Sequence, residues 1–376
     1  MKIAIEALGI HNYGGGRTAI LNLLHNLLAI DQSNQYLVIL SQLEPSLSTP
    51  AGNMQQLVMP IKNRFLARVW AQMYLPIKLR NYDLVHFTKN LGVFGMPIPT
   101  IITIYDMTTL IHPELFPMLD VLYWQHIQER SLQRADRVIA ISHNTKQAIM
   151  SFYQVETDKI AVIYPSVSLC FQPSSPQRIA QIQLKYQLPE KFILHVGRLD
   201  RKKNITCLVE GFAHFRQQLN HDYAGKLVIV GGKYAKSPDS DLVPTIQRLG
   251  LKQDIIFTGR VPDADLAPLY SGAQVVVLTS HHEGFGLVAV EAMACGTALI
   301  AHRTGAIPEV VGEAAVLLDD IDPQSLAAAI HSVVGDSLLR EKLRQAGLQR
   351  ARRFQTRDDA RETLKLYTEV TVDDRE

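Results

Sequence analysis

The chain of 376 residues is about twice the length of an ordinary domain, so two domains are expected. Hydrophobic residues make up 47% of it and charged residues 20%, a composition typical of a folded globular protein. Its formal net charge of +2 excludes a whole-protein basic field for nucleic acid. Cys170, Cys207 and Cys295 form no CxxC pair, which predicts neither a disulfide framework nor a cysteine zinc site and fits a reducing cytoplasm.

Short apolar strand patterns alternate with helical patterns along most of the chain. In the first half they cover residues 2–8, 36–42, 83–87, 100–106, 137–142 and 159–165, and in the second half 191–197, 226–232, 254–259, 273–280 and 297–302. Near-continuous apolar strands separated by helices indicate parallel sheets covered on both faces. We therefore expect an α/β protein of two doubly wound, Rossmann-like domains that face across a cleft, with ligands at the carboxyl ends of the strands.

A segment rich in proline and serine separates the two halves, from Tyr164 to Gln187. It predicts an N-terminal domain over 1–170, a linker over 171–188 and a C-terminal domain over 189–352, followed by a charged helical tail over 353–376. The N-terminal apolar stretch is too short for a signal peptide, and no window approaches the roughly 18 apolar residues of a spanning helix. A cytoplasmic protein is expected.

A segment rich in glutamate and glycine follows the strand pattern over 273–280. Glu283 and Glu291 stand eight positions apart, with Gly284 and Gly286 at the turn that opens a helix. This spacing is just over two helical turns, so both carboxylates face one side. Free amides at the helix start suit a phosphate, and the carboxylates suit sugar hydroxyls. The alternative is a tight turn with two solvated glutamates.

The same segment fits the dinucleotide pattern G-x-G-x-x-A, with Glu309 roughly twenty residues further on. That fingerprint belongs at the first strand-to-helix turn of a domain, whereas this turn follows a late strand. The glutamate directly before the first glycine would also repel a pyrophosphate. A dehydrogenase is kept as an alternative.

A basic loop follows the first strand pattern of the second half. Arg198, Arg201, Lys202 and Lys203 place four cations in six residues. Such a loop can neutralise a diphosphate, because each charge-assisted hydrogen bond contributes roughly 1.5 to 3 kcal/mol. Strand exits of one domain share a sheet edge, so this loop and the Glu283 turn should face the same crevice. The alternative is a solvated loop before a helix.

Consecutive glycines, Gly14 to Gly16, lie between the first strand pattern and the first helix. They allow the backbone to approach a ligand closely, as in an anion cradle, or they form a merely structural turn. Asp-x-Asp occurs at 239–241, 263–265 and 320–322, which would suit a metal-dependent transferase of another fold. Each copy adjoins a proline and reads better as helix capping, with Asp322 as N-cap before Pro323.

Four motifs together resemble the retaining glycosyltransferase family 4, which has the GT-B fold: GGGRT over 14–18, VGRLDRKKN over 196–204, FTGRV over 257–261 and EGFGLVAVEAMACGT over 283–297. The resemblance covers nearly the whole chain. Its end, ARRFQTRDDARETLKLY over 351–367, is similar to the family's crossover helix, which returns to the N-terminal domain.

The resemblance implies that Arg198 and Lys203 bind the donor diphosphate and stabilise the departing nucleotide, and that Glu283 holds the donor sugar. Glu291 would bind the ribose hydroxyls. Further donor contacts would come from backbone and side chains of Gly15, Gly16, Gly284, Phe285, Gly286, Leu287 and Val288, and Arg260 and Val261 would flank the base.

Two positions depart from the family pattern. Tyr105 stands where a sugar-contacting histidine is usual, which leaves the donor sugar open, and Asn204 stands where glycine is common. His86, Tyr105 and Asp106 are the candidates for the acceptor site or the sugar pocket. A structural role for His86 at its strand end is the alternative.

The function implied is a retaining hexosyltransferase that needs no metal cofactor and acts on a glycan or glycolipid acceptor. Residues 103–117 resemble bacterial mannosyltransferases, so GDP-mannose is the first donor expected and UDP-glucose the second. A sugar-nucleotide epimerase and a non-catalytic sugar-nucleotide-binding protein are the alternatives on the same fold.

The stretch from Pro45 to Tyr82 contains no acidic residue. Between Lys62 and Arg80, cations interleave with apolar side chains, namely Arg64, Arg68 and Lys78 with Phe65, Leu66, Val69, Trp70, Met73 and Tyr74. A basic amphipathic helix of this kind suits an anionic membrane surface. A core-facing helix or a wall for an acidic glycan would show the same pattern.

Overall fold

The computed structural model describes residues 1–10, 14–47, 52–59, 61, 64–219, 223–232 and 239–373. Asn12 and Tyr13, which precede the predicted glycine segment Gly14 to Gly16, and Lys62 of the basic stretch lie outside this description. The chain forms two compact units. Unit 1 comprises Met1–Ser166 and Thr356–Glu376, and unit 2 comprises Val167–Gln355.

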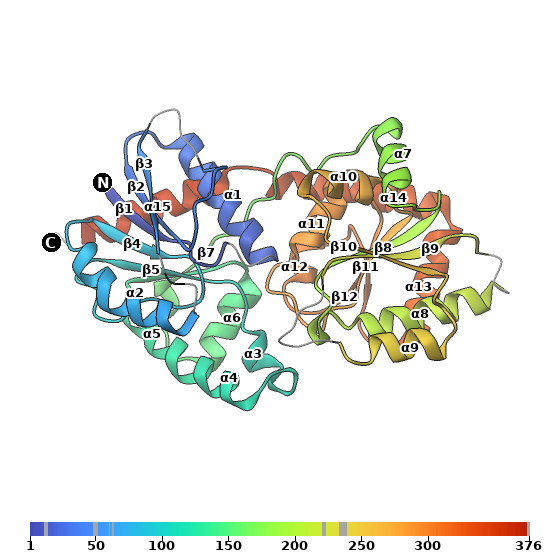
Figure 1. Cartoon of the computed structure of the whole chain (residues 1–376), viewed down its shortest axis with the longest axis horizontal. Coiled ribbons are helices and arrows are strands. Elements are labelled where there is room, and N and C mark those ends of the chain that lie inside the picture. The colour runs from blue at the N-terminus through green and yellow to red at the C-terminus, as the bar shows by residue number, and fades with distance from the viewer. Residues whose placement is uncertain are drawn as a thin grey trace. The chain divides into compact units, whose positions relative to one another are not determined.

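Each unit contains one parallel sheet with helices packed against it (Figure 1). In the described part of unit 1, the strand order is β3-β2-β1-β4-β5-β6-β7. These strands are β1 (Lys2–Glu6), β2 (Gln35–Leu40), β3 (Met54–Val58), β4 (Leu84–Phe87), β5 (Thr100–Ile104), β6 (Arg137–Ala140) and β7 (Ile160–Val162). The direction of winding reverses between β1 and β4, which makes that point the topological switch of the sheet.

Unit 2 repeats this winding, with the order β10-β9-β8-β11-β12-β13. Its strands are β8 (Phe192–Val196), β9 (Lys226–Val230), β10 (Ile255–Gly259), β11 (Val275–Leu278), β12 (Leu299–His302) and β13 (Val316–Leu318). The switch lies between β8 and β11, where Val275 pairs with Ile193 and Val276 with Leu194. Ligands of such sheets bind at the carboxyl ends of the strands beside the switch.

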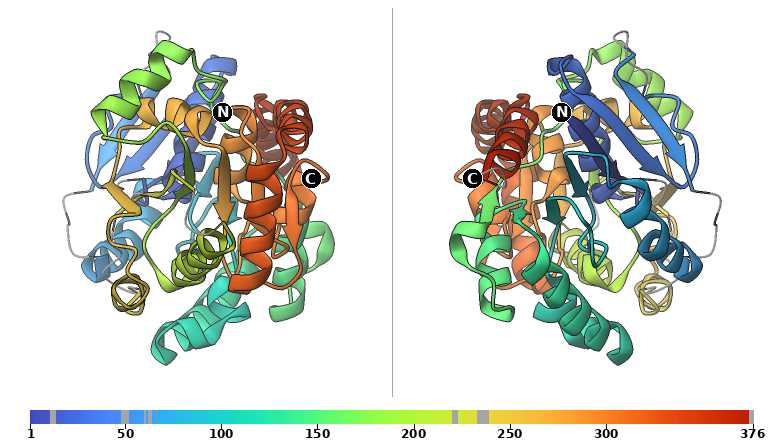
Figure 2. Two further views of the ribbon diagram at one scale, coloured as in Figure 1. Left: turned by 90° about the vertical axis from the view of Figure 1, so that its right-hand side faces the viewer. Right: turned by 90° about the vertical axis from the view of Figure 1, so that its left-hand side faces the viewer.

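The last helix of the chain belongs to unit 1, where α15 (Asp358–Asp373) packs beside α1 (Gly15–Ile30), as Figures 1 and 2 show. Leu366, Tyr367 and Val370 of α15 are buried in the same core cluster as the strands β1 and β2. The other helices of unit 1 are α2 (Arg64–Lys78), α3 (Thr108–Ile111), α4 (Met118–Tyr123), α5 (Glu129–Arg134) and α6 (His143–Phe152), with a π-helical turn over Trp124–Gln128 and 3₁₀ turns over Pro113–Leu115 and Thr157–Lys159.

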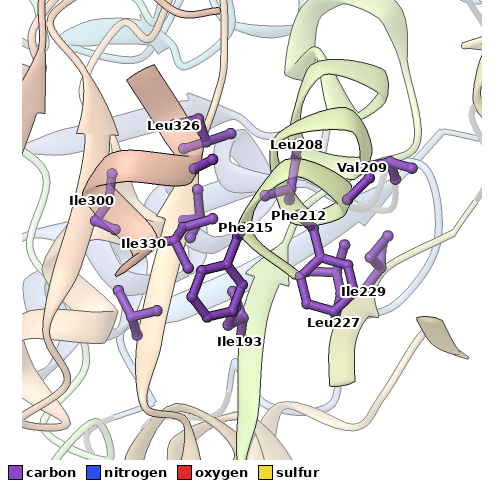
Figure 3. Packing of buried hydrophobic residues seen from close by; sticks show 14 of the residues in the cluster. Ile193, Leu208, Val209, Phe212, Phe215, Leu227, Ile229, Ile300, Leu326 and Ile330 are labelled. Carbon is purple, nitrogen blue, oxygen red and sulfur yellow. The ribbon is translucent and has the colours of Figure 1, made fainter. Parts of the chain in front are cut away.

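The main core of unit 2 lies between its sheet and two helices. Phe212 and Phe215 of α8 (Ile205–Gln218) and Ile330 of α13 (Pro323–Gly335) point onto the strands (Figure 3). The remaining helices are α7 (Pro176–Lys185), α9 (Leu242–Arg248), α10 (Asp263–Gly272), α11 (Leu287–Ala294), α12 (Ile307–Val311) and α14 (Ser337–Ala351), with 3₁₀ turns over Arg201–Lys203 and Arg352–Phe354. Burying this apolar surface is what fixes the strand exits of unit 2 in space.

Every strand pattern expected from the sequence contains a strand, but two short edge strands were missed. β3 reads MQQLV and is only partly buried, and β13 has three residues, so neither shows a strong apolar run. The segment expected as a linker contains α7, whose N-cap Ser175 accepts a hydrogen bond from the Arg178 amide. Among the residues that the structure describes, no helix is long and apolar enough to cross a bilayer.

Candidate active site

The basic loop and the glutamate turn meet at the switch point of unit 2. The loop leaves β8 after Val196 and the turn leaves the neighbouring strand β11 after Leu278. Nζ of Lys203 donates a hydrogen bond to Oε1 of Glu283 at 2.5 Å. The expectation that both segments lie at one sheet edge is confirmed.

Glu283 is held as an anion. The Ser280 hydroxyl donates a second hydrogen bond to Oε1, at 2.7 Å. Burial by itself raises the pKa of Glu283, but the charges of Lys203 and Lys202 and the two hydrogen bonds outweigh it and lower the pKa to about 2. The carboxylate therefore stays ionised at any working pH, and it fixes the Lys203 ammonium group.

Arg198 is oriented by a carboxylate that the sequence did not single out. Nη2 of Arg198 lies 3.1 Å from Oδ2 of Asp200, whose side chain is only 3% exposed. Burial raises the pKa of Asp200, and the nearby Arg198 and Lys203 charges oppose that rise. The buried Asp200 carboxylate thus holds the Arg198 side chain in place within the basic loop.

The exit of β9 holds the basic loop in place through backbone contacts. The amide of Gly197 donates to the carbonyl of Val230 at 2.9 Å, and the amide of Leu199 donates to the carbonyl of Gly232 at 3.1 Å. Gly231 has φ +145°, and a Cβ there would lie 1.7 Å from the Gly197 carbonyl oxygen. Only glycine fits, and the Gly-Gly pair after the strand pattern over 226–232 was the signal that sequence reasoning passed over.

Asn204 explains one departure from the family pattern. Its backbone is left-handed, with φ 50° and ψ 46°, where it ends the 3₁₀ turn of the basic loop and begins α8. Glycine adopts this conformation without cost, and asparagine is among the few other residues that tolerate it. The substitution therefore keeps the loop geometry.

The helix α11 begins directly after the glutamate turn. Gly286 is its N-cap with φ 93°, and the first-turn amides of Leu287 and Val288 are among those that a helix leaves without an internal partner. Four residues into the helix, the side chain of Glu291 is buried and accepts a hydrogen bond from the Tyr270 hydroxyl at 2.7 Å. Burial raises the pKa of Glu291 to about 7.

The other residues of the glutamate turn, Gly284 and Phe285, are buried. Phe285 is 3% exposed and meets the Phe354 ring edge-on at 5.4 Å. The Glu283 carbonyl accepts a hydrogen bond from the Ala306 amide at 2.9 Å. Gly305 has φ +55°, and a Cβ there would lie 2.2 Å from that same carbonyl oxygen. Gly305 was missed, although it follows the strand pattern over 297–302.

Arg260 and Val261 follow β10, the edge strand two positions from β8. Arg260 is exposed and Val261 half-buried. A Cβ on Gly232 would lie 3.2 Å from Nε of Arg260, so this guanidinium group runs close over the β9 exit. The predicted base-flanking residues therefore stand at the same sheet edge as the basic loop.

In unit 1, the glycine loop leads into a helix start that is open. Gly14 is the N-cap of α1, no side chain among the described residues caps the helix, and its first turn contains no acidic residue. Gly15 is exposed and Gly16 half-buried. A Cβ on Gly16 would meet nothing within 4 Å among the described residues. Packing within the described chain thus does not require glycine at position 16.

His86 lies in the core of unit 1 and is fully buried. Hydrogen bonds of 2.7 Å join its Nδ1 to the Tyr367 hydroxyl on α15 and its Nε2 to the Thr103 hydroxyl. Burial lowers the pKa of His86 to about 3, so the ring is neutral. Both ring nitrogens are engaged by the protein, and the geometry agrees with the structural alternative.

Tyr105 and Asp106 stand at the exit of β5. The Tyr105 amide donates to Oδ1 of Asn90 at 2.9 Å, and its partly buried ring packs against the unit 1 core. Oδ1 of Asp106 accepts a hydrogen bond from the Thr108 amide at 3.2 Å. Tyr105 and Asp106 therefore lie at the carboxyl edge of the sheet, whereas His86 lies within the strand β4.

The three Asp-x-Asp segments are engaged within the fold where the structure describes them. Asp322 caps α13 through the amides of Gln324 and Ser325, with Pro323 in the first turn, which confirms the predicted cap. Asp265 is bound by Arg178, Lys185 and Tyr186, and Asp239 binds Thr206 at the start of α8. In the described ranges, no three His, Cys, Asp or Glu side chains are grouped to hold a metal ion.

Two family models match the chain. The model for glycosyl transferases group 1 matches residues 177–350, and the model for Glycosyltransferase Family 4 matches residues 13–170. Together they cover most of both units and leave residues 1–12, 171–176 and 351–376 unmatched.

Curated relatives and a solved structure agree with these matches. O-antigen chain mannosyltransferase B of Escherichia coli is 28% identical over 77% of this chain and 75% of its own length. Serotype-specific mannosyltransferase WbdA of Escherichia coli is 26% identical over 76% of this chain. The matched region is 35% of the length of WbdA. HepE from Anabaena, solved in complex with UDP and glucose, superposes with a TM-score of 0.80 at 22% identity, over 98% of this chain and 99% of HepE. The chain is therefore a glycosyltransferase of the GT-B fold and belongs to the glycosyltransferase family 4 type.

Proposed function

We propose that this glycosyltransferase moves a hexose from a nucleoside-diphosphate sugar to a glycan or lipid-linked glycan acceptor, with retention at the anomeric carbon. The observation that carries the proposal is the Lys203–Glu283 pair beside Arg198 at the switch point of unit 2. It supplies cations for a diphosphate and a fixed carboxylate for sugar hydroxyls at one sheet edge.

The chemistry follows from the charges. Cleavage of the bond to the diphosphate builds negative charge on the leaving phosphate and positive character at the anomeric carbon. In this proposal Arg198 and Lys203 stabilise the negative charge on the leaving phosphate, aided by the first-turn amides of α11. In front-face attack the leaving phosphate takes the acceptor's proton, so these residues meet the electrostatic need without a metal ion.

The donor is proposed to be GDP-mannose, with UDP-glucose second. The relatives named mannosyltransferases support the first, and the HepE complex with UDP and glucose supports the second. The thermal unfolding midpoint, measured with GDP, UDP, ADP and NAD, each with EDTA and then with Mg²⁺, decides between them. Saturation at about 100-fold over Kd stabilises the bound unit by roughly 2.7 kcal/mol, which raises the midpoint by several degrees.

The expected result is a shift with GDP in EDTA, absent in an Arg198→Ala, Lys203→Ala double variant. An Arg248→Ala variant is the control, because Arg248 is an exposed cation of unit 2 that pairs with Glu210. A shift with NAD alone would replace the proposal by a dehydrogenase. Donor binding without transfer or hydrolysis on a broad acceptor panel would replace it by a non-catalytic sugar-nucleotide-binding protein.

We also propose that unit 1 contacts an anionic membrane surface when the acceptor is lipid-linked. An apolar stripe is exposed along α2 at Leu66, Val69, Met73 and Ile77. Arg68 on the same helix donates to the Tyr123 hydroxyl at 2.5 Å and lies 5.0 Å from its ring centroid, which joins α2 to α4. The helix α4 adds exposed Met118, Leu119 and Leu122. Apolar area next to cations suits a bilayer of anionic lipid.

Vesicle sedimentation tests this surface. The wild-type protein should pellet with phosphatidylglycerol-containing vesicles at low salt and not with pure phosphatidylcholine, and a Met73→Glu, Ile77→Glu variant should stay in the supernatant. Val243→Glu serves as the matched control, since Val243 is an exposed apolar residue of α9 in unit 2. Equal pelleting of all three proteins, or none of the wild type, would remove the membrane proposal.

A further inference from the structure

A buried tyrosine holds the second glutamate of the active site. Tyr270 is fully buried near the end of α10, and its hydroxyl donates to Oε2 of Glu291 at 2.7 Å. Its own backbone carbonyl accepts a hydrogen bond from the Thr297 hydroxyl at 2.7 Å, and its ring meets Phe171 edge-on. The tyrosine is thus fixed at both ends.

The two oxygens of the Glu291 carboxylate have different surroundings. Among the described residues, Tyr270 is the hydrogen-bond partner of the Glu291 side chain, through Oε2. The other oxygen, Oε1, is therefore available to a ligand. Glu291 lies on α11, and the first turn of this helix leaves the amides of Leu287 and Val288 without partners inside the helix. An ionised carboxylate only accepts hydrogen bonds, so it suits a ligand that offers hydroxyl donors.

Near neutral pH the ionised and protonated forms of Glu291 have similar populations. Burial raises the pKa of Glu291 to about 7, the hydrogen bond from Tyr270 opposes the rise, and the Asp263 carboxylate adds to it. Tyr270 and Asp263 face the group from α10, and the thiol of Cys295 faces it from the end of α11. Removing the Tyr270 hydroxyl would therefore favour the protonated acid.

We propose that Tyr270 is a positioning residue that orients the Glu291 carboxylate, in its ionised form, toward the vicinal hydroxyls of the donor's ribose. The inference rests on the proposed function, because it requires a nucleoside diphosphate at this site. The new element is that Tyr270 and Glu291 together make the affinity for the donor depend on pH. Protonation of Glu291 turns one acceptor oxygen into a donor and weakens the hold on the ribose.

The test measures Kd for GDP and UDP by calorimetry between pH 6 and 9. Wild-type affinity should fall as the pH falls through about 7. In Tyr270→Phe, Kd at pH 7 should rise about tenfold, the loss expected for one hydrogen bond to a charged group, and the fall in affinity should begin at higher pH. KM for the donor should change more than kcat, since the reacting phosphate is untouched.

Two controls separate this role from a packing defect. Tyr223→Phe removes another buried hydroxyl of unit 2, which donates to Oε1 of Gln274 at 2.7 Å, and should leave Kd unchanged at every pH. Glu291→Gln keeps the shape of the side chain and should abolish the pH dependence. A 2′-deoxy nucleoside diphosphate should bind the wild type more weakly and should lose little further affinity in Tyr270→Phe.

The outcomes are distinguishable. If the wild type binds neither nucleotide, the proposed function fails and takes this inference with it. If the wild type binds but Tyr270→Phe shows the same Kd and the same pH profile, the positioning role is overturned while the transferase proposal stands.

Discussion

Lys203 and Glu283 are 80 positions apart in the sequence, yet Nζ of one lies 2.5 Å from Oε1 of the other. Their side chains are 16% and 15% exposed. The pair exists because β8 and β11 are neighbours at the reversal of strand order. An ion pair in this place holds both groups in one geometry before a ligand arrives.

Removing the cation of this pair should lower the activity strongly. We expect Lys203→Ala to lower kcat/KM by about 10² to 10³, because a preorganised charge aimed at the leaving phosphate is lost. Steady-state kinetics with the donor found by the nucleotide screen provides the measurement. Arg248→Ala, which removes an exposed cation from the same unit, should stay within twofold; equal losses in both variants would show that the effect is not local.

Gly305 should be intolerant of a side chain for a reason that concerns Glu283. In Gly305→Ala, the Cβ would meet the Glu283 carbonyl oxygen at 2.2 Å in addition to a strained φ of +55°. Gly250→Ala isolates the strain alone, since Gly250 has φ +68° and open space around its Cβ position. Gly250→Ala should lose about 1 to 3 kcal/mol of unfolding free energy by urea titration. Gly305→Ala should lose more than that, because the clash adds to the strain, and only Gly305→Ala should lose donor binding. Equal donor affinity in the two variants contradicts this.

Gly16 should tolerate alanine structurally but not functionally. A Cβ there meets nothing within 4 Å among the described residues, and the same holds for Gly335 at the end of α13. Neither alanine variant should therefore lower the thermal midpoint by more than a degree or so. If a diphosphate approaches the start of α1, Gly16→Ala should raise donor KM about tenfold while Gly335→Ala leaves it unchanged. Unchanged kinetics in both would remove Gly16 from the site.

His86 should make the protein sensitive to acid. Its pKa is lowered from 6.5 to about 3, so below pH 6.5 the unfolded chain binds a proton that the folded chain does not. Stability conferred by this group is present above about pH 6.5 and is lost as the pH falls toward 3, at up to about 1.4 kcal/mol per pH unit. Urea unfolding at pH 7 and pH 5 should show a smaller drop in His86→Gln than in the wild type. His331→Gln, an exposed histidine of α13, should behave as the wild type.

The fold could be predicted where the pattern was long and apolar. The strands beside both switch points, β1, β4, β8 and β11, are almost wholly buried, and their sequences show it. β3 and β13 lie at sheet edges and lack that signal. The shared edge of the basic loop and the Glu283 turn also followed from the sequence, because parallel strands end at one side of a sheet.

The rest of the site depends on contacts between distant backbone segments, which no local pattern encodes. Glycine is needed at positions 231 and 305 because the backbone of another loop lies where a Cβ atom would be. Tyr270 reaches Glu291 from a neighbouring helix, and Asp200 reaches back to Arg198 under the loop. Each of these contacts forms only when the helices and the strand exits pack together.

Unit 2 is one continuous stretch of chain, whereas unit 1 needs residues from both ends of the protein. Residues 1–166 are synthesised before residues 167–355, but their core lacks Leu366, Tyr367 and Val370 until unit 2 has been made. His86 likewise waits for the Tyr367 hydroxyl. Unit 1 begins to be synthesised before unit 2 but is completed after it, and the nascent chain carries an unfinished apolar face while unit 2 folds.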